Sequence, residues 1–304
     1  MTGDTLVWLR WLQFVDLGVV FGVPLTACLL GERHANVKWR RGLALGCFLG
    51  LLFGTASFAF TLARMAGSGI DDLDRSLIFM MLTGSALGWS MIARGIALTA
   101  ALVLALIPPG GNGKWLSALA GLGAVAVASL AWAGHAAASQ GELGILRLGG
   151  DVAHLWAGLT WLGALMLFAA HLWQARADDH ATLTRLAREL GAFAGLGTLL
   201  VGVLVASGLG NLLFLSPPGQ WPVIAQTAYG RLLIAKLALF AVMLVLAARN
   251  RFQLVPALET TDGHLARQLA LDALRRSITL EGLLALGVIW CIADAGTLDP
   301  TGAA

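Results

Sequence analysis

Eight apolar stretches, each long enough to cross a lipid bilayer, take up most of this 304-residue chain. They cover residues 5–31, 42–63, 77–107, 115–137, 152–173, 191–215, 228–248 and 277–296. A crossing needs about 20 apolar residues, and a helix satisfies its own backbone hydrogen bonds in lipid. Hydrophobic residues are 58% of the chain and charged residues 12%, which leaves little polar surface for a water-soluble fold. We predict an all-α integral membrane protein with eight transmembrane helices, forming one domain over residues 1–304.

The loops between these stretches alternate in positive charge. The loops after the first, third, fifth and seventh stretches hold 13 of the 20 Lys and Arg residues. Because basic loops stay in the cytoplasm, both termini are predicted on the opposite side of the membrane. The first stretch is too long for a signal peptide and lacks a basic start, so we expect it to remain as a span. Basic cytoplasmic loops favour anionic lipid as a partner and argue against nucleic acid.

The third stretch, 77–107, is too long for one straight crossing, so we expect residues 76–82 to form a short interfacial segment before the helix. Glycine is abundant, with 38 residues, and recurs every fourth position in two stretches. This spacing predicts a smooth helix face on which backbones approach closely. The glycines concerned are Gly42, Gly46, Gly50, Gly54, Gly191 and Gly195.

Two halves of the chain can be laid over each other. Gly88 stands six residues before Arg94 in the third stretch, and Gly230 stands six residues before Lys236 in the seventh. The order of the elements is the same in both halves, and each half starts on the outer side. The sequence therefore predicts two parallel four-helix repeats. The predicted repeats cover residues 5–137 and 152–296.

Two histidines stand out because ionisable residues inside a membrane are costly and are functional candidates. His135 ends the fourth stretch and His154 begins the fifth, so both are expected at the outer membrane edge, where their rings could converge. Asp151 lies one turn before His154 on the same helix face and could orient its ring. Imidazole binds copper, zinc, iron or nickel, so this pair alone does not select a metal. The alternative is that each ring only makes local hydrogen bonds.

Further polar or sulfur-bearing side chains within the spans could support such a site or line a path. Thioethers suit Cu(I), although methionine in an apolar helix is more often a packing residue. The two basic residues within spans could pair with carboxylates, or could act in gating or hold an anionic group. These supporting candidates are Gln13, Asp16, Met80, Met81, Arg94, Lys236 and Glu281. Motifs for nucleotide hydrolysis are not found, and we do not expect an enzyme.

Several short motifs follow one another along the chain. They include Gly134-His135-Ala136, Asp151 and His154 with Trp161 and Gly163, and Ser207-Gly208 with Asn211. Further motifs are Thr227-Ala228-Tyr229-Gly230 with Lys236, then Asn250-Arg251 with Pro256, and Glu281. Taken in this order, they resemble the motifs of the CopD family of bacterial inner-membrane copper proteins, and the resemblance runs from Arg10 to Pro300.

This resemblance implies eight spans, an inner-membrane location, copper ions as the bound species, and a periplasmic copper carrier of the CopC type as partner. It also implies that His135 and His154 are the copper ligands. One departure is Gln13 in the Arg10-Trp11-Leu12-Gln13 stretch, where relatives commonly have histidine. An amide oxygen is a poorer copper ligand than imidazole.

The leading hypothesis is therefore an inner-membrane copper transport or homeostasis protein that takes copper from a periplasmic carrier and passes it across the membrane. A second hypothesis is a haem-binding membrane cytochrome. A third is a non-transporting membrane sensor or scaffold that docks the periplasmic carrier. The sequence leaves open the direction of transport and the oxidation state of the copper.

Overall fold

A computed structural model describes residues 2–32, 37–108, 114–133, 142–215, 217–260 and 263–298. Within these ranges the chain is helical and contains no strand. Seven helical segments are long and apolar enough to cross a membrane, which confirms an all-α, multi-pass membrane protein. They are α1 with α2 (Asp4–Leu29), α3 (Val37–Ala66), α5 (Ala86–Leu106), α7 (Leu143–Gln174), α8 (His180–Leu215), α10 with α11 (Ala228–Thr260) and α12 (His264–Ala295).

In the region of the fourth predicted span, the regular helix ends earlier than predicted. Helix α6 covers Lys114–Ala128, only 15 residues, and a 3-10 turn follows at Ala131–Ala133. The Ser129 hydroxyl donates to the carbonyl of Ala126 and accepts from the Arg94 guanidinium, 2.9 Å away. These polar contacts lie where the regular helix ends. The apolar run in the sequence continues beyond this point, so hydropathy alone extends the helix too far.

Several helices are longer than the apolar stretches that predict them. Helix α7 already begins at Glu142, and α8 and α12 begin about three turns before their predicted spans. The extra turns of α8 are amphipathic and bury Leu183, Leu186 and Leu190. A helix can continue past the hydrocarbon into water when one face stays packed, whereas hydropathy detects only the lipid-embedded part.

The break predicted near the start of the third stretch is present. Helix α4 (Arg75–Gly84) ends at Ser85, whose extended backbone begins α5. The Ser85 hydroxyl accepts from the amide of Gly88, 3.0 Å away, as an N-cap. The same arrangement recurs in the second half, where the Thr227 hydroxyl accepts from the amide of Gly230 at 3.0 Å. The two positions matched by sequence thus share their local geometry.

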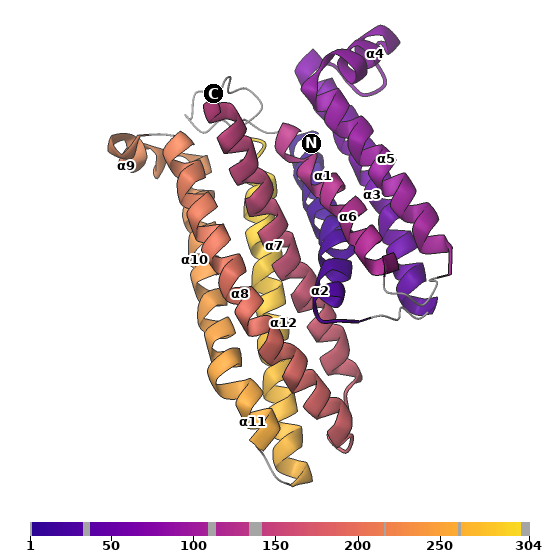
Figure 1. Cartoon of the computed structure of the whole chain (residues 1–304). Helices are drawn as coiled ribbons and strands as arrows, with labels where there is room; N and C mark the ends of the chain where they lie inside the picture. Colours follow the sequence, from indigo (N-terminus) through magenta and orange to yellow (C-terminus); the bar gives the residue numbers. More distant parts are fainter. Residues whose placement is uncertain are drawn as a thin grey trace.

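The helices form two groups that meet at α1, α7 and α12 (Figure 1). The first group holds α1 to α6, and the second holds α7, α8, α10 and α12. The start of α1 and the end of α12 lie at the same end of the bundle, where the rings of Trp8 and Trp290 are 4.4 Å apart. We call this end the N-terminal end of the bundle.

The two groups are in backbone contact where the first transmembrane segment, α1 with α2, crosses α7. A short π-helical segment, Gly18–Gly22, interrupts the α1–α2 helix there. A Cβ atom on Gly22 would lie 2.1 Å from the carbonyl oxygen of Leu159, and one on Gly163 would lie 2.2 Å from the backbone of Gly22. Only glycine allows two backbones to approach this closely. The contact fixes α7, and with it the site described next.

Candidate functional site

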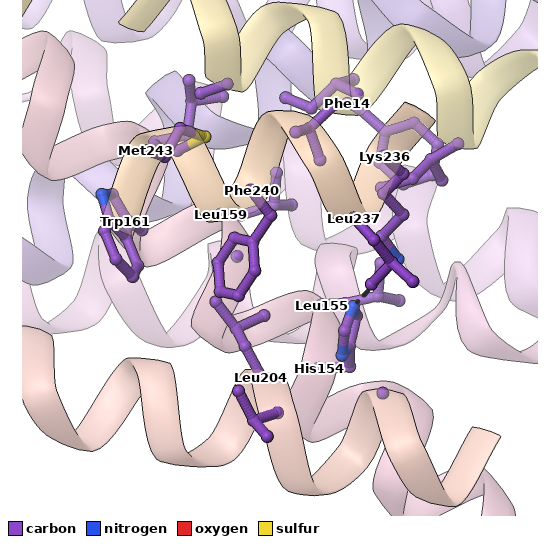
Figure 2. A pocket seen from close by; sticks show the side chains of 18 of the residues that line it. Phe14, His154, Leu155, Leu159, Trp161, Leu204, Lys236, Leu237, Phe240 and Met243 are labelled. Atoms are coloured by element: carbon purple, nitrogen blue, oxygen red, sulfur yellow. Dashed lines mark hydrogen bonds between the residues drawn. The ribbon is translucent and has the colours of Figure 1, made fainter. Parts of the chain in front are cut away.

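A cavity of about 390 Å³ lies in the second group of helices, with walls from α1, α7, α8, α10 and α12. Most of its lining is leucine, isoleucine, valine and phenylalanine. His154 and Lys236 lie at one end, and Met243 and Trp161 lie at the other, with Phe240 between them (Figure 2). Small-molecule and ion sites are commonly apolar cavities with a few polar groups such as these.

The His154 ring has a defined hydrogen-bonding pattern. Its Nδ1 atom lies 2.9 Å from the hydroxyl of Ser207 on α8. A serine hydroxyl has one proton, and Ser207 donates it to the carbonyl of Val203. The ring must therefore carry its own proton on Nδ1 and donate it to Ser207. This leaves the Nε2 lone pair free for a cation or a donor, which is how metal-binding histidines are held.

Lys236 on α10 is the nearest basic group to this lone pair. Its Nζ atom lies 3.5 Å from Nε2 of His154, a long contact (Figure 2). Lys236 makes no ion pair with an acidic residue of the described chain. Asp151 on α7 lies close enough to interact with it electrostatically. The predicted pairing of Lys236 with a carboxylate is thus a longer-range interaction.

A second hydrogen bond holds α7 against α8 one turn above His154. Asn211 hydrogen-bonds to the carboxylate of Asp151, just as Ser207 bonds to His154. Gly208 lies between them, and a Cβ atom there would be 3.5 Å from the His154 ring. The sequence predicts that Asp151 holds the His154 ring, but in the structure the hydroxyl of Ser207 makes this contact. Asp151 instead joins α7 to α8 through Asn211, one turn away.

Glu281 on α12 lies beside the other end of the cavity and is 2% exposed. Its two carboxylate oxygens accept hydrogen bonds from the Trp161 indole at 2.9 Å and from the Asn250 amide at 3.0 Å. Asn250 begins a π-helical segment, Asn250–Leu254, that ends the regular part of α10. The described residues offer Glu281 no cationic partner within ion-pair distance.

The remaining predicted residues do not gather around His154. Gln13, Asp16 and Arg94 belong to the first group of helices, and Met80 and Met81 belong to α4 at the N-terminal end of the bundle. His135 lies outside the described residues, so its distance from His154 stays a prediction. Among the predicted residues, the structure brings His154, Asp151 and Lys236 together. Glu281 lies next to the same cavity, where it contacts the lining residue Trp161.

Sequence reasoning misses two groups of residues. Met243 lines the cavity, and Ser207 contacts it only through its hydrogen bond to His154, although in the sequence Ser207 stands out only as part of a motif. At the opposite end of the bundle, the nitrogens of His171 lie 3.7 Å from Glu32 and 3.5 Å from Glu189. Arg185 also pairs with both carboxylates, at 3.2 and 2.6 Å. Local sequence does not show which residues of different helices will pair, so this cluster is visible only in the structure.

Comparison with known proteins fits this arrangement. The model for the copper resistance protein D-like N-terminal domain matches residues 1–145, and the model for copper resistance protein D matches residues 187–294. Copper resistance protein D of Pseudomonas syringae pv. tomato is 34% identical over 300 residues, 96% of this chain and 95% of that protein. The chain belongs to the copper resistance protein D family. Inner membrane protein YebZ of Escherichia coli K12 is 26% identical over 277 residues, 88% of this chain and 90% of that protein.

No solved structure matches the chain significantly. Membership of the copper resistance protein D family confirms the resemblance inferred from the sequence motifs, and makes this a copper-related membrane protein. The structure gives those motifs a physical meaning. Asp151 and His154 on α7 face Asn211 and Ser207 on α8, one turn apart on each helix. Four of the residues that carry the resemblance therefore join the two helices beside the cavity.

Proposed function

We propose that this protein moves copper across the bacterial inner membrane, with His154 as a ligand of the transported ion. The observation that carries the proposal is the orientation of the His154 ring, whose Nδ1 donates to Ser207 and whose Nε2 lone pair remains available. In a copper resistance protein D relative, a fixed imidazole at the end of a membrane cavity is suited to copper. Transport requires no chemical reaction on the protein, so we assign no enzymatic activity.

The proposed orientation places the N-terminal end of the bundle in the periplasm. The predicted cytoplasmic loops carry most of the basic residues, and the first and last helices start and end at the same side. An even number of crossings is needed for that arrangement. We propose that the short α6 makes the eighth crossing and that the chain consists of two parallel four-helix repeats. His154 would then lie nearer the periplasm than Glu281 does.

A periplasmic copper carrier of the CopC type is the proposed donor. Copper would pass from the carrier to His154, with His135 as a second proposed ligand. Met243 lies at the far end of the cavity and offers a thioether, a ligand suited to Cu(I). The apolar walls between the two ends provide no alternative ligands, so an ion would be passed between a small number of sites.

Lys236 would compete with copper for the same lone pair. Its ammonium lies 3.5 Å from Nε2 of His154, so a bound cation must displace it. A like charge at about 4 Å costs about 1 kcal/mol even in water and more in lipid. Lys236→Leu removes the charge without adding a ligand and is therefore expected to tighten copper binding roughly tenfold. Weaker binding in this variant would show that Lys236 supports the site.

Copper flux into proteoliposomes that contain the purified protein tests the proposal. His154→Ala and the double variant His135→Ala with His154→Ala are expected to lose most of the flux. His264→Ala is the matched control, because His264 is exposed at the start of α12, at the opposite end of the bundle. Unchanged flux in the His154 variants would remove this residue from the mechanism.

The same preparation separates the other two hypotheses. A wild-type protein that binds the periplasmic carrier but carries no copper would be a sensor or scaffold. A Soret band in its visible spectrum would indicate a haem protein. We favour transport over haem binding because ligation by two histidines needs two rings facing each other. Among the described residues, His154 is the histidine that lines the cavity.

A further inference from the structure

A second, smaller cavity lies in the first group of helices. It has a volume of about 100 Å³ and is enclosed mainly by α1, α3 and α5. Phe14 lines both this cavity and the larger one, on the other side of α1. More of its lining residues are polar than in the cavity beside His154. The polar residues are Arg10, Gln13, Ser57, Thr61, Ser90 and Arg94.

Two arginines line this cavity without a carboxylate beside them. Arg94 is 6% exposed and donates through Nε to the Ser129 hydroxyl at 2.9 Å. Arg10 is half-buried, and the two guanidinium groups are close enough to repel each other. Neither forms an ion pair with an Asp or Glu of the described chain. Two like charges among membrane helices are costly unless an opposite charge joins them.

Three further polar atoms around the cavity are buried without a hydrogen-bond partner in the described chain. They are Nε of Arg10, Nε2 of Gln13 and Oγ of Ser57. Gln13 is 5% exposed, so water at the protein surface does not satisfy its amide. All three can donate a hydrogen bond, and a buried donor without an acceptor costs about 1–3 kcal/mol. These three donors therefore have no acceptor within hydrogen-bonding distance in the described chain.

The nearest acidic residue of α1, Asp16, does not line this cavity. Asp16 lies one turn beyond Gln13, and its carboxylate points at α3, 2.6 Å from where a Cβ atom on Gly50 would lie. Asp16 thus forms no ion pair with either arginine.

We propose that the cavity binds one small monovalent inorganic anion of about the size of chloride. The anion accepts hydrogen bonds from Arg10, Arg94 and Gln13 and neutralises part of their charge. Charge-assisted hydrogen bonds of this kind are roughly twice as strong as neutral ones. A copper cation is disfavoured here, because two guanidinium groups repel it. The inference does not depend on copper transport through the second group of helices.

Thermal unfolding of the full-length protein in detergent, followed by its tryptophan fluorescence, tests the inference. Sodium chloride is compared with sodium gluconate at equal ionic strength, because gluconate is too large for the cavity. A ligand that binds only the folded protein raises the unfolding temperature as its concentration rises above Kd. Chloride is expected to raise it with a saturating dependence, and gluconate is not.

Arg94→Gln is expected to weaken chloride binding by at least about tenfold, the loss expected for one charged hydrogen-bond donor. Arg231→Gln is the matched control, because Arg231 is exposed on α10 and outside the cavity. Gln13→Leu and Ser57→Ala remove only neutral donors, and they test the site if the arginine variant fails to fold. Each is expected to shift the chloride midpoint upward.

Binding of radioactive chloride to the purified wild-type protein gives a direct measurement. Saturable binding that is reduced in the cavity variants and kept in Arg231→Gln supports the inference. Equal unfolding temperatures in chloride and gluconate would overturn it. The same holds if Gln13→Leu and Ser57→Ala respond to chloride as the wild type does.

Discussion

Ser207 on α8 and His154 on α7 are joined by a hydrogen bond of 2.9 Å whose direction is fixed by a third group. Ser207 gives its only proton to the carbonyl of Val203, so the proton of the imidazole must lie on Nδ1. The hydroxyl thus selects the tautomer in which Nε2 faces the cavity with a lone pair. A residue outside the apolar pattern thereby controls what His154 can bind.

Ser207→Ala is expected to weaken copper binding roughly 10- to 100-fold, the usual effect of losing a hydrogen-bond partner behind a metal-binding histidine. The ring would then rotate or change tautomer. Copper titration of the purified protein measures the affinity. Thr184→Ala is the matched control, since Thr184 makes the same type of bond to its own helix but is exposed. An unchanged affinity in Ser207→Ala would show that the Ser207 hydroxyl does not set the ring.

Glu281→Ala is expected to destabilise the protein strongly. The carboxylate accepts from Trp161 and Asn250, and its loss leaves two buried donors, each costing about 1–3 kcal/mol. Glu281→Gln keeps the side-chain volume and one acceptor, so its loss of stability is expected to be about half as large. In detergent, the unfolding temperature is therefore expected to be highest for the wild type, lower for Glu281→Gln and lowest for Glu281→Ala.

Glu259→Gln is the control for this pair of variants, because Glu259 is exposed on α11. It is expected to unfold at the wild-type temperature. If Glu281→Ala unfolds at that temperature as well, the three-residue contact contributes little to stability. Tryptophan fluorescence offers an independent readout, since the indole of Trp161 loses its acceptor in Glu281→Ala.

Much of the fold follows from hydropathy. Each of the seven long helices overlaps a predicted stretch, and the length of the third stretch predicts the break before α5. Hydropathy does not predict the end of α6. That end depends on Ser129, whose hydroxyl bonds Arg94 on a different helix. A local apolar pattern contains no information about such a partner.

The glycine pattern is informative in one helix and misleading in another. In α3, Gly46, Gly50 and Gly54 face side chains of the first transmembrane segment, as their spacing predicts, whereas a Cβ atom on Gly42 would meet nothing of the described chain within 4 Å. A Cβ atom added at Gly191 or Gly195 would meet no neighbouring atom of the described chain within 4 Å. The spacing shows that a smooth face exists, whereas the presence of a neighbour depends on how the helices assemble.

The candidate site is predictable only in part. His154, Lys236 and Glu281 are conspicuous because charged or ionisable groups are rare in apolar helices. Ser207 and Asn250 belong to sequence motifs, but their contacts with His154 and Glu281 are seen only when the helices are assembled. The rotation of each helix about its axis decides these contacts. That rotation is set by packing between helices, including the Gly22–Gly163 crossing.

The N-terminus of α8 should show a dependence on acidity. Asp179 accepts hydrogen bonds from the amide and hydroxyl of Thr182, and these bonds lower the pKa of its carboxyl. A lowered pKa in the folded protein adds stability above the unfolded value of about 3.9, and this stability is lost as pH falls through the folded value. Protection of the first turn of α8 from hydrogen exchange should therefore decrease as the pH falls below about 4. In Asp179→Asn, whose cap does not titrate, protection should stay level over the same range.

Asp178→Asn is the control for this acid dependence, because it alters the adjacent exposed carboxylate, which pairs with Arg176. It should lose protection with falling pH as the wild type does. An identical pH dependence in the wild type and Asp179→Asn would show that the carboxylate of Asp179 does not cap α8.

The Gly22–Gly163 crossing gives the sharpest prediction about packing. In Gly163→Ala the new methyl group would meet the backbone of Gly22 at 2.2 Å, and backbone cannot move aside as a side chain can. The two groups of helices must then separate, at a cost of about 1–3 kcal/mol or more. Gly191→Ala places the same methyl group in open space within a helix and is expected to gain about 0.5–1 kcal/mol, because alanine favours helix over glycine. Unfolding temperatures should move in opposite directions, and copper binding at His154 should weaken only in Gly163→Ala, since α7 carries both residues. Equal stability of the two variants would mean that α1 and α7 are not in backbone contact.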